Sequence, residues 1–202
     1  MHPKRTIAKP PGIPPPAPKE PGLDSLLELR RGLTSKDPKE MQDAAWEFKS
    51  LAESGGDVSS LISILPQALK ASFSPESGTL AKTYLTEGIA NLAKTGADLN
   101  ACLPVLISAL DDNSIQVRNS AILALGSYGL SSGNSSTIAP SIFPKLSDIA
   151  PIVKGSAMSV LKSMAKEDTK AAERILSLLD QDPPSSTKSY HEELRAACSP
   201  DP

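Results

Sequence analysis

The clearest structural pattern of the chain lies between Asp98 and Leu130, DLNACLPVLISALDDNSIQVRNSAILALGSYGL. At about 100° per residue, its first half predicts a helix with one wide apolar face, made of Leu99, Cys102, Leu103, Leu106, Ala109 and Leu110. Short polar side chains at positions 111–114 then break the pattern, as they do in turns. The second half predicts another helix, whose stripe contains Val117, Ala121, Ala124, Leu125 and Tyr128. Such a helical pair needs similar neighbours to bury its apolar face.

Related segments recur on both sides of this stretch. SLAESGGDV begins at residue 50, and the matching NLAKTGADL begins 41 positions later at residue 91. The segment from Leu110 to Ala121 aligns without gaps to the one from Leu146 to Ala157, 36 positions later. An apolar residue followed by proline also recurs, at positions 65–66, 103–104 and 143–144. A period of about 40 residues predicts a stack of four to five helical hairpins.

The central unit resembles a HEAT repeat. The residues that carry the resemblance are Leu103-Pro104, Leu110-Asp111-Asp112, Val117-Arg118, Ala121, Ala124, Leu125 and Gly126. The resemblance implies that the proline bends the first helix, and that an acidic turn residue and the arginine form ladders between stacked repeats. Asp112 or Asp111 and Arg118 would take those places here, and Lys82 is the candidate replacement for Arg118 in the preceding repeat. We therefore expect an all-α superhelix, or α-α solenoid, of HEAT-like hairpins.

Three parts of the chain differ in composition. Residues 1–22 are proline-rich, and we expect an extended, disordered tail that serves either as a ligand for a proline-binding module or as a solubilising linker. Residues 23–198 carry the repeat pattern and form the predicted repeat domain. Its fifth repeat is either a full pair of helices or a single capping helix. Residues 199–202 are expected to be a disordered end.

Composition excludes several classes of partner. The chain has 23 acidic residues against 21 Lys and Arg, a net charge of −2, and only 3% aromatic residues. No strong basic field favours nucleic acid or an anionic membrane, and a base-stacking surface lacks its aromatic side chains. We see no signal peptide and no apolar run approaching the ~20 residues of a membrane span. We therefore expect a cytoplasmic protein, in agreement with Cys102 as a buried free thiol.

The sequence offers little for catalysis. Its two histidines are His2 and His191, so no second histidine from the predicted repeats could complete a nucleophilic or metal site. HEAT-like metal oxygenases use several His-Glu pairs, whereas this chain has only His191-Glu192. The carboxylates of Asp111 and Asp112 are expected to cap helices or to pair with Arg118. We therefore predict no enzymatic activity and no catalytic, cofactor or metal site.

The candidate binding surface follows from the resemblance, because the second helices of HEAT repeats line the concave face. Residues of those helices outside the apolar stripes form a predicted ridge, acidic at one end and basic at the other. This ridge suits an extended peptide or a partner helix, although it could also be merely a solvated face. Trp46 is a candidate interface anchor unless it packs against the preceding helix or the tail. The candidate partner-binding residues are Asp43, Trp46, Glu47, Thr83, Glu87, Asn91, Asn119, Leu123, Ser127, Ser159, Lys162 and Lys166.

The function predicted from these features is a non-catalytic protein-binding scaffold or adaptor. Three alternatives come from the HEAT-like resemblance or from the stacked architecture. One is a subunit or helper of a chromophore (bilin) lyase, and another is a structural subunit that docks through the end of the array. The third, a HEAT-like DNA glycosylase, is disfavoured by the net charge of −2 and the single tryptophan, Trp46.

Overall fold

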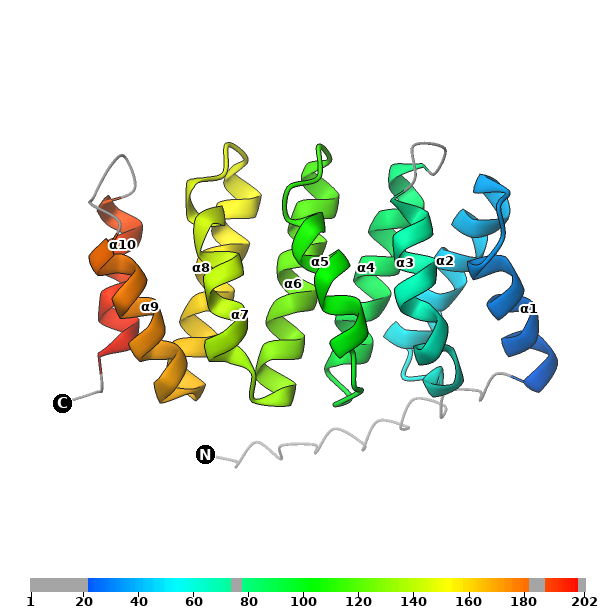
Figure 1. Ribbon diagram of the computed structural model, residues 1–202, viewed down its shortest axis with the longest axis horizontal. Helices are drawn as coiled ribbons and strands as arrows, with labels where there is room; N and C mark the ends of the chain where they lie inside the picture. The colour runs from blue at the N-terminus through cyan, green and yellow to red at the C-terminus, as the bar shows by residue number, and fades with distance from the viewer. Residues whose placement is uncertain (1–21, 74–77, 182–187, 200–202) are drawn as a thin grey trace, which may run out of the picture.

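The computed structural model describes residues 22–73, 78–181 and 188–199 (Figure 1). Within these ranges the chain is all-α and contains no strand, as the sequence predicts. Of the predicted tail and C-terminal end, only Gly22 and Ser199 are described, so the expected disorder lies outside these ranges. The elements are α1 (Leu23–Leu33), α2 (Pro38–Glu53), the 3-10 helix η1 (Ser59–Ile64), α3 (Leu65–Ser72), α4 (Thr79–Ala93), η2 (Asn100–Cys102), α5 (Leu103–Ala109), α6 (Ile115–Ser132), α7 (Ser135–Ile142), η3 (Phe143–Ser147), α8 (Pro151–Glu167), α9 (Thr169–Gln181) and α10 (Lys188–Cys198).

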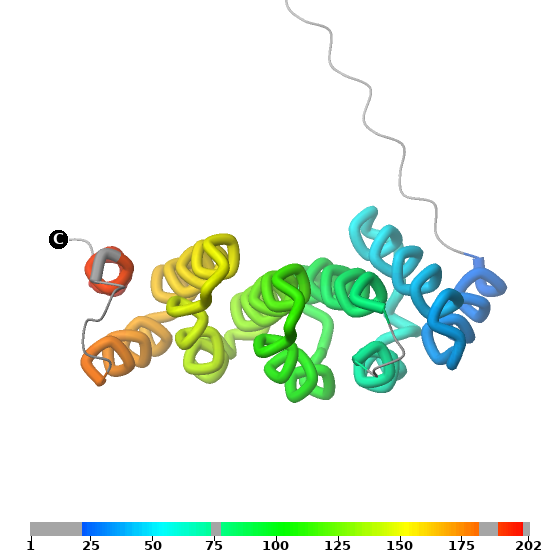
Figure 2. Tube along the Cα trace, turned by 90° about the horizontal axis from the view of Figure 1, so that it is seen from above, coloured from blue at the N-terminus to red at the C-terminus, as the bar shows by residue number. Residues whose placement is uncertain are grey.

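The helices form two parallel rows (Figure 2). In one row α2 packs on α4, α4 on α6, α6 on α8, and α8 on α10. The other row contains α1, α3, α5, α7 and α9 together with the short 3-10 helices. The array is gently bowed, and the α2-to-α10 row lies on its inner side. This is the solenoid predicted from the repeat, and its fifth repeat, α9 with α10, is a full pair of helices.

Proline breaks the first helix of each central repeat. The single helix predicted between Leu99 and Leu110 is instead a 3-10 helix followed by an α-helix, and residues 59–72 of the preceding repeat have the same arrangement. Pro66 and Pro104 occupy the first turn of α3 and α5, where a helix does not need the missing N–H group. In the next repeat the order is reversed, since α7 comes first and Pro144 opens η3.

The turns confirm the 41-residue repeat. Gly55 and Gly96 occupy equivalent positions and have φ of 76° and 80°, a region that favours glycine because it lacks a Cβ atom. Two residues later, the carboxylates of Asp57 and Asp98 accept hydrogen bonds from the backbone N–H groups of Ser59 and Asn100. Each pair closes the turn that leads into the next 3-10 helix.

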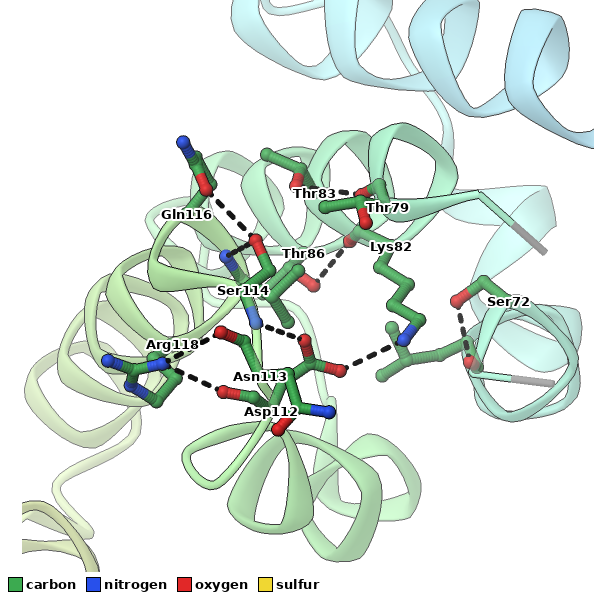
Figure 3. A network of polar contacts seen from close by, with 12 residues as sticks. Ser72, Thr79, Lys82, Thr83, Thr86, Asp112, Asn113, Ser114, Gln116 and Arg118 are labelled. Carbon is green, nitrogen blue, oxygen red and sulfur yellow. Dashed lines mark hydrogen bonds and ion pairs between the residues drawn. The ribbon is translucent and has the colours of Figure 1, made fainter. Parts of the chain in front are cut away.

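A ladder of charged side chains connects successive repeats, and Figure 3 shows its step from Lys82 to Asp112. Arg118 Nε and Nη2 donate to the two carboxylate oxygens of Asp148 at 2.8 and 2.9 Å. Lys82 Nζ donates to Asp112 at 2.9 Å, so Lys82 does take the place of Arg118 one repeat earlier. Arg118 Nη1 also donates to the backbone carbonyl of Asp112, which joins the two steps of the ladder. The other candidate, Asp111, pairs instead with Lys145.

Candidate functional site

The inner row carries a hollow with two aromatic side chains, between α2 and α4. It has a volume of about 600 Å³ and is lined by Gln42, Asp43, Trp46, Glu47 and Tyr84. We call it the Trp46 hollow. Trp46 is 57% exposed, so packing against the preceding helix does not cover it. A large aromatic side chain held in the open beside a second aromatic residue is a typical anchor for a binding partner.

A capped start and a buried face hold α2 in place. The Asp37 carboxylate caps the helix by accepting hydrogen bonds from the N–H groups of Lys39 and Glu40 at 2.8 and 3.0 Å. The opposite face of the helix is anchored by Ala45 and Phe48, which are fully buried. At about 100° per residue, residues 46 and 47 lie on the other side of the helix from residues 45 and 48. Their side chains therefore point away from the core.

Carboxylates dominate the surroundings of this hollow. Glu47 accepts a hydrogen bond from Ser25 of α1 at 3.5 Å, and Asp43 forms an exposed ion pair with Lys39 at 3.2 Å. A smaller hollow between α1 and α2 shares Asp43 and Glu47 with it and adds Glu28, Glu40 and Arg31. The local balance of charge is negative, which favours a cationic occupant.

The Tyr84 side of the hollow is braced by an ion pair. Lys49 Nζ lies 2.8 Å from Glu87 Oε2, joining α2 to α4, and 5.6 Å from the centroid of the Tyr84 ring. The Glu87 carboxylate beside it raises the pKa of Lys49. The pair therefore links the two helices that carry Trp46 and Tyr84.

A second hollow on the inner row collects four of the predicted ridge residues. It lies where α2, α4 and α6 meet and has a volume of about 300 Å³. Leu123 is 42% exposed at its edge, an apolar side chain on an otherwise polar surface. Lys94 donates to the Asn91 side chain at 2.9 Å within the same hollow. The predicted residues that the structure brings together here are Glu87, Asn91, Leu123 and Ser127.

Two ridge residues are occupied by internal contacts. Thr83 is buried, and its hydroxyl donates to the backbone carbonyl of Thr79 at 2.9 Å, so its prediction as a contact residue is corrected. The physical reason is that α4 has neighbours on both sides within the row, which cover more than the stripe facing the other row. Asn119 accepts a hydrogen bond from Ser156 at 2.7 Å and so connects α6 to α8.

The predicted basic end is partly neutralised. Lys162 donates to Glu193 of α10 at 2.7 Å, so its charge has an internal partner. Lys166 and Lys162 line another hollow, between α8, α9 and α10, away from the Trp46 hollow. Ser159 is exposed on α8 and lines none of these hollows. The ridge therefore divides into an acidic, aromatic N-terminal part and a separate C-terminal part.

Sequence reasoning missed Tyr84, Gln42 and Lys49. Tyr84 lay outside the predicted apolar stripe of its helix, in a chain with only three tyrosines and one tryptophan. In a chain with so few aromatic residues, an aromatic side chain outside the apolar stripe indicates a candidate binding residue. Nothing in the sequence showed that this residue would lie beside Trp46, since the two come from different repeats.

The two side chains of the His191-Glu192 pair lie in different surroundings. His191 is buried, with its ring 6.3 Å from that of Phe143, whereas Glu192 is exposed on the same helix. Among the residues that the structure describes, no three His, Cys, Asp or Glu side chains gather as metal ligands. Over the same residues, no helix has the length and apolar character required to span a membrane.

Neither a protein-family model nor a curated protein sequence matches the chain. Among solved structures, an engineered protein aligns over 86% of this chain and 77% of its own, with a TM-score of 0.60 and 18% identity. A designed armadillo repeat protein aligns over 86% of this chain and 80% of its own, with a TM-score of 0.57 and 18% identity. These matches show that the fold is that of the armadillo and HEAT α-solenoids.

Proposed function

We propose that this α-solenoid is a non-catalytic protein-binding scaffold. Its inner row would hold an extended peptide or a helix of a partner protein across the hollows that lie along α2, α4 and α6. The observation that carries the proposal is the exposed Trp46 beside Tyr84 in a hollow of about 600 Å³. A few aromatic anchors of this kind supply most of the binding energy in protein interfaces.

The spacing of the hollows supports an elongated occupant. The Trp46 hollow and the hollow at Leu123 both use α4, so they are adjacent along the row. An extended chain that crosses the helices would place successive side chains into successive hollows, as alternate side chains do in other peptide complexes. A compact small molecule would fill only one of them.

Charge narrows the class of partner. Asp43 and Glu47 line the Trp46 hollow, whereas its neighbour holds Glu53 and Glu87 together with Lys49 and Lys94. The carboxylates of the Trp46 hollow oppose a phosphate backbone and favour a protein segment that carries Lys or Arg. We therefore infer a protein ligand rather than a nucleic acid.

The proposal is tested by selecting binding peptides from a random library against the full chain, and then measuring affinities by titration calorimetry. Trp46→Ala is expected to weaken the selected peptides by about 30-fold or more, as for a central aromatic anchor. Glu47→Lys is expected to weaken those that contain Lys or Arg. Selected peptides that keep full affinity for both variants would place the binding surface elsewhere.

Two matched variants control for unrelated effects. Ile107→Ala removes an exposed apolar side chain from α5 in the other row, and Glu173→Lys reverses an exposed charge on α9. Both should bind the selected peptides as tightly as the unmodified chain. Far-UV circular dichroism melts of all four variants should agree within a few degrees, which separates loss of contact from loss of fold.

A further inference from the structure

We propose that residues 1–21 of the same chain bind in the Trp46 hollow and compete there with an external ligand. The competition rests on the proposed function, and the docking itself does not. Residues 1–21 lie outside the described part of the structure. Three features favour this occupant: its chemistry, the place where it joins the fold, and the lining of the alternative hollow.

The chemistry of the segment complements the hollow. MHPKRTIAKPPGIPPPAPKEP contains eight prolines, three of them consecutive at positions 14–16. Its charged residues are Lys4, Arg5, Lys9 and Lys19 against Glu20 alone. Proline-rich segments dock on exposed aromatic side chains at little entropic cost, because their backbone is already restricted. The Trp46 and Tyr84 rings supply that aromatic surface, and the carboxylates beside them complement the cationic side chains.

The segment also joins the fold at the right place. Helix α1 begins at Leu23, and Ser25 in its first turn donates to the Glu47 carboxylate at 3.5 Å. Glu47 itself lines the Trp46 hollow, so the chain enters the solenoid at the edge of the proposed site. At about 3.1 Å per residue, ten extended residues cover roughly 30 Å, more than the ~24 Å length of α2. A tether this short raises the effective concentration of the segment to the millimolar range.

The other large hollow is a poor alternative. It lies at the far end of the array, where Lys162 is already paired with Glu193, and its lining contains no carboxylate that would attract a cationic segment. Its two lysines are accompanied by small and hydroxyl side chains, and it has no aromatic ring for proline to cover. Of these two hollows, the one at Trp46 combines aromatic surface with negative charge.

The chain provides its own probe, because Trp46 is its only tryptophan. Acrylamide quenching of tryptophan fluorescence in the full chain therefore measures access to this hollow alone. Two variants alter the segment: Pro14→Ser with Pro15→Ser and Pro16→Ser, and Lys9→Glu with Lys19→Glu. Each is expected to raise the Stern–Volmer quenching constant about two-fold. The matched control, Pro183→Ser with Pro184→Ser, alters prolines between α9 and α10 and should leave the constant unchanged.

A peptide added in trans completes the test. A synthetic peptide of residues 1–21, at millimolar concentration, should restore protection to the triple proline variant. It should fail to do so when Glu47→Lys is added to that variant. Equal quenching in the unmodified chain and both segment variants would overturn the proposal. Protection that appears only as protein concentration rises would also overturn it, since a second copy would then cover Trp46.

Competition between residues 1–21 and an external ligand is measured separately, as a change in peptide affinity. If the segment occupies the hollow, the chain with the triple proline substitution should bind a library-selected peptide about ten-fold more tightly than the unmodified chain does. An unchanged affinity would overturn competition. Failure to select any peptide that depends on Trp46 would instead refute the proposed function, and the quenching result would remain valid by itself. The two failures are therefore distinguishable.

Discussion

At the scale of single residues, the ladder between repeats is the clearest link from sequence to energy. Arg118 and Asp148 form a two-pronged pair with side chains that are 10% and 7% exposed. The guanidinium holds the pKa of Asp148 below its ordinary value of 3.8. A carboxyl whose pKa is lower in the folded chain stabilises the fold above pH 3.8, and that contribution is lost as the pH falls through the folded pKa.

Asp148→Asn is therefore expected to lower the free energy of unfolding at pH 7 by about 3 kcal/mol, because it leaves Arg118 buried without its counter-charge. The difference from the unmodified chain should begin to shrink below pH 3.8, where Asp148 is protonated in the unfolded chain, and it should disappear only below the lower pKa of the folded chain. Urea unfolding at pH 7 and at pH 3 measures both values. Asp43→Asn, which breaks the exposed pair with Lys39, is the control and should have little effect at either pH. A pH-independent difference for Asp148→Asn would contradict the ladder as an ionic contact.

At the scale of elements, the inner row depends on close approach between helices. A Cβ atom at Gly88 of α4 would lie 2.5 Å from the Phe48 ring of α2 and 3.2 Å from the Lys49 backbone. A Cβ atom at Gly126 of α6 would lie 2.6 Å from Val160 of α8. Glycine at these positions lets α2 approach α4, and α6 approach α8, closely enough to form a continuous row.

Gly88→Ala is expected to destabilise the fold by about 2 kcal/mol, since the ring and the backbone that it meets must both move. Gly155→Ala provides the matched comparison, because a Cβ atom there meets nothing within 4 Å on the exposed side of α8. This second change should stabilise the fold by about 0.5–1 kcal/mol through helix propensity. Chemical denaturation gives both values, and destabilisation by both substitutions would point to a cause other than helix spacing.

At the scale of the whole molecule, the array is quasi-one-dimensional. Each helix of the inner row packs on its immediate neighbours, so the ends are coupled only through the repeats between them. Trp46 lies near the N-terminal end and reports on that part alone, whereas far-UV circular dichroism reports on all the helices. The two signals can therefore separate when one end is weakened.

Phe48→Ala, which opens a cavity between α2 and α4, should lower the urea midpoint of Trp46 fluorescence more than that of circular dichroism. Leu194→Ala opens an equivalent cavity in α10 and should leave the fluorescence midpoint above the one from circular dichroism. Unfolding followed by both signals on the same samples makes the comparison. Coincident midpoints in both variants would mean that the array unfolds as a single cooperative unit.

Much of the fold could be predicted from particular residues. The stripe around Leu106 and Leu125, the turn residues 111–114 and the repeated Gly-x-Asp segments depend on helical periodicity and turn chemistry. These are local properties, so they predict the helical pairs and their period of about 40 residues, whereas the ladder from Arg118 was expected from the resemblance to HEAT repeats. The sequence also placed Trp46 outside the core of its helix.

Only the tertiary structure decided what surrounds each ridge residue. Thr83 is covered by neighbouring helices, Lys162 has Glu193 as its partner, and Tyr84 lies across from Trp46. Each of these facts depends on how one repeat is rotated and shifted against the next. That packing follows from contacts between side chains about 30 to 40 residues apart in the chain. The periodicity of a single helix carries no information about such contacts.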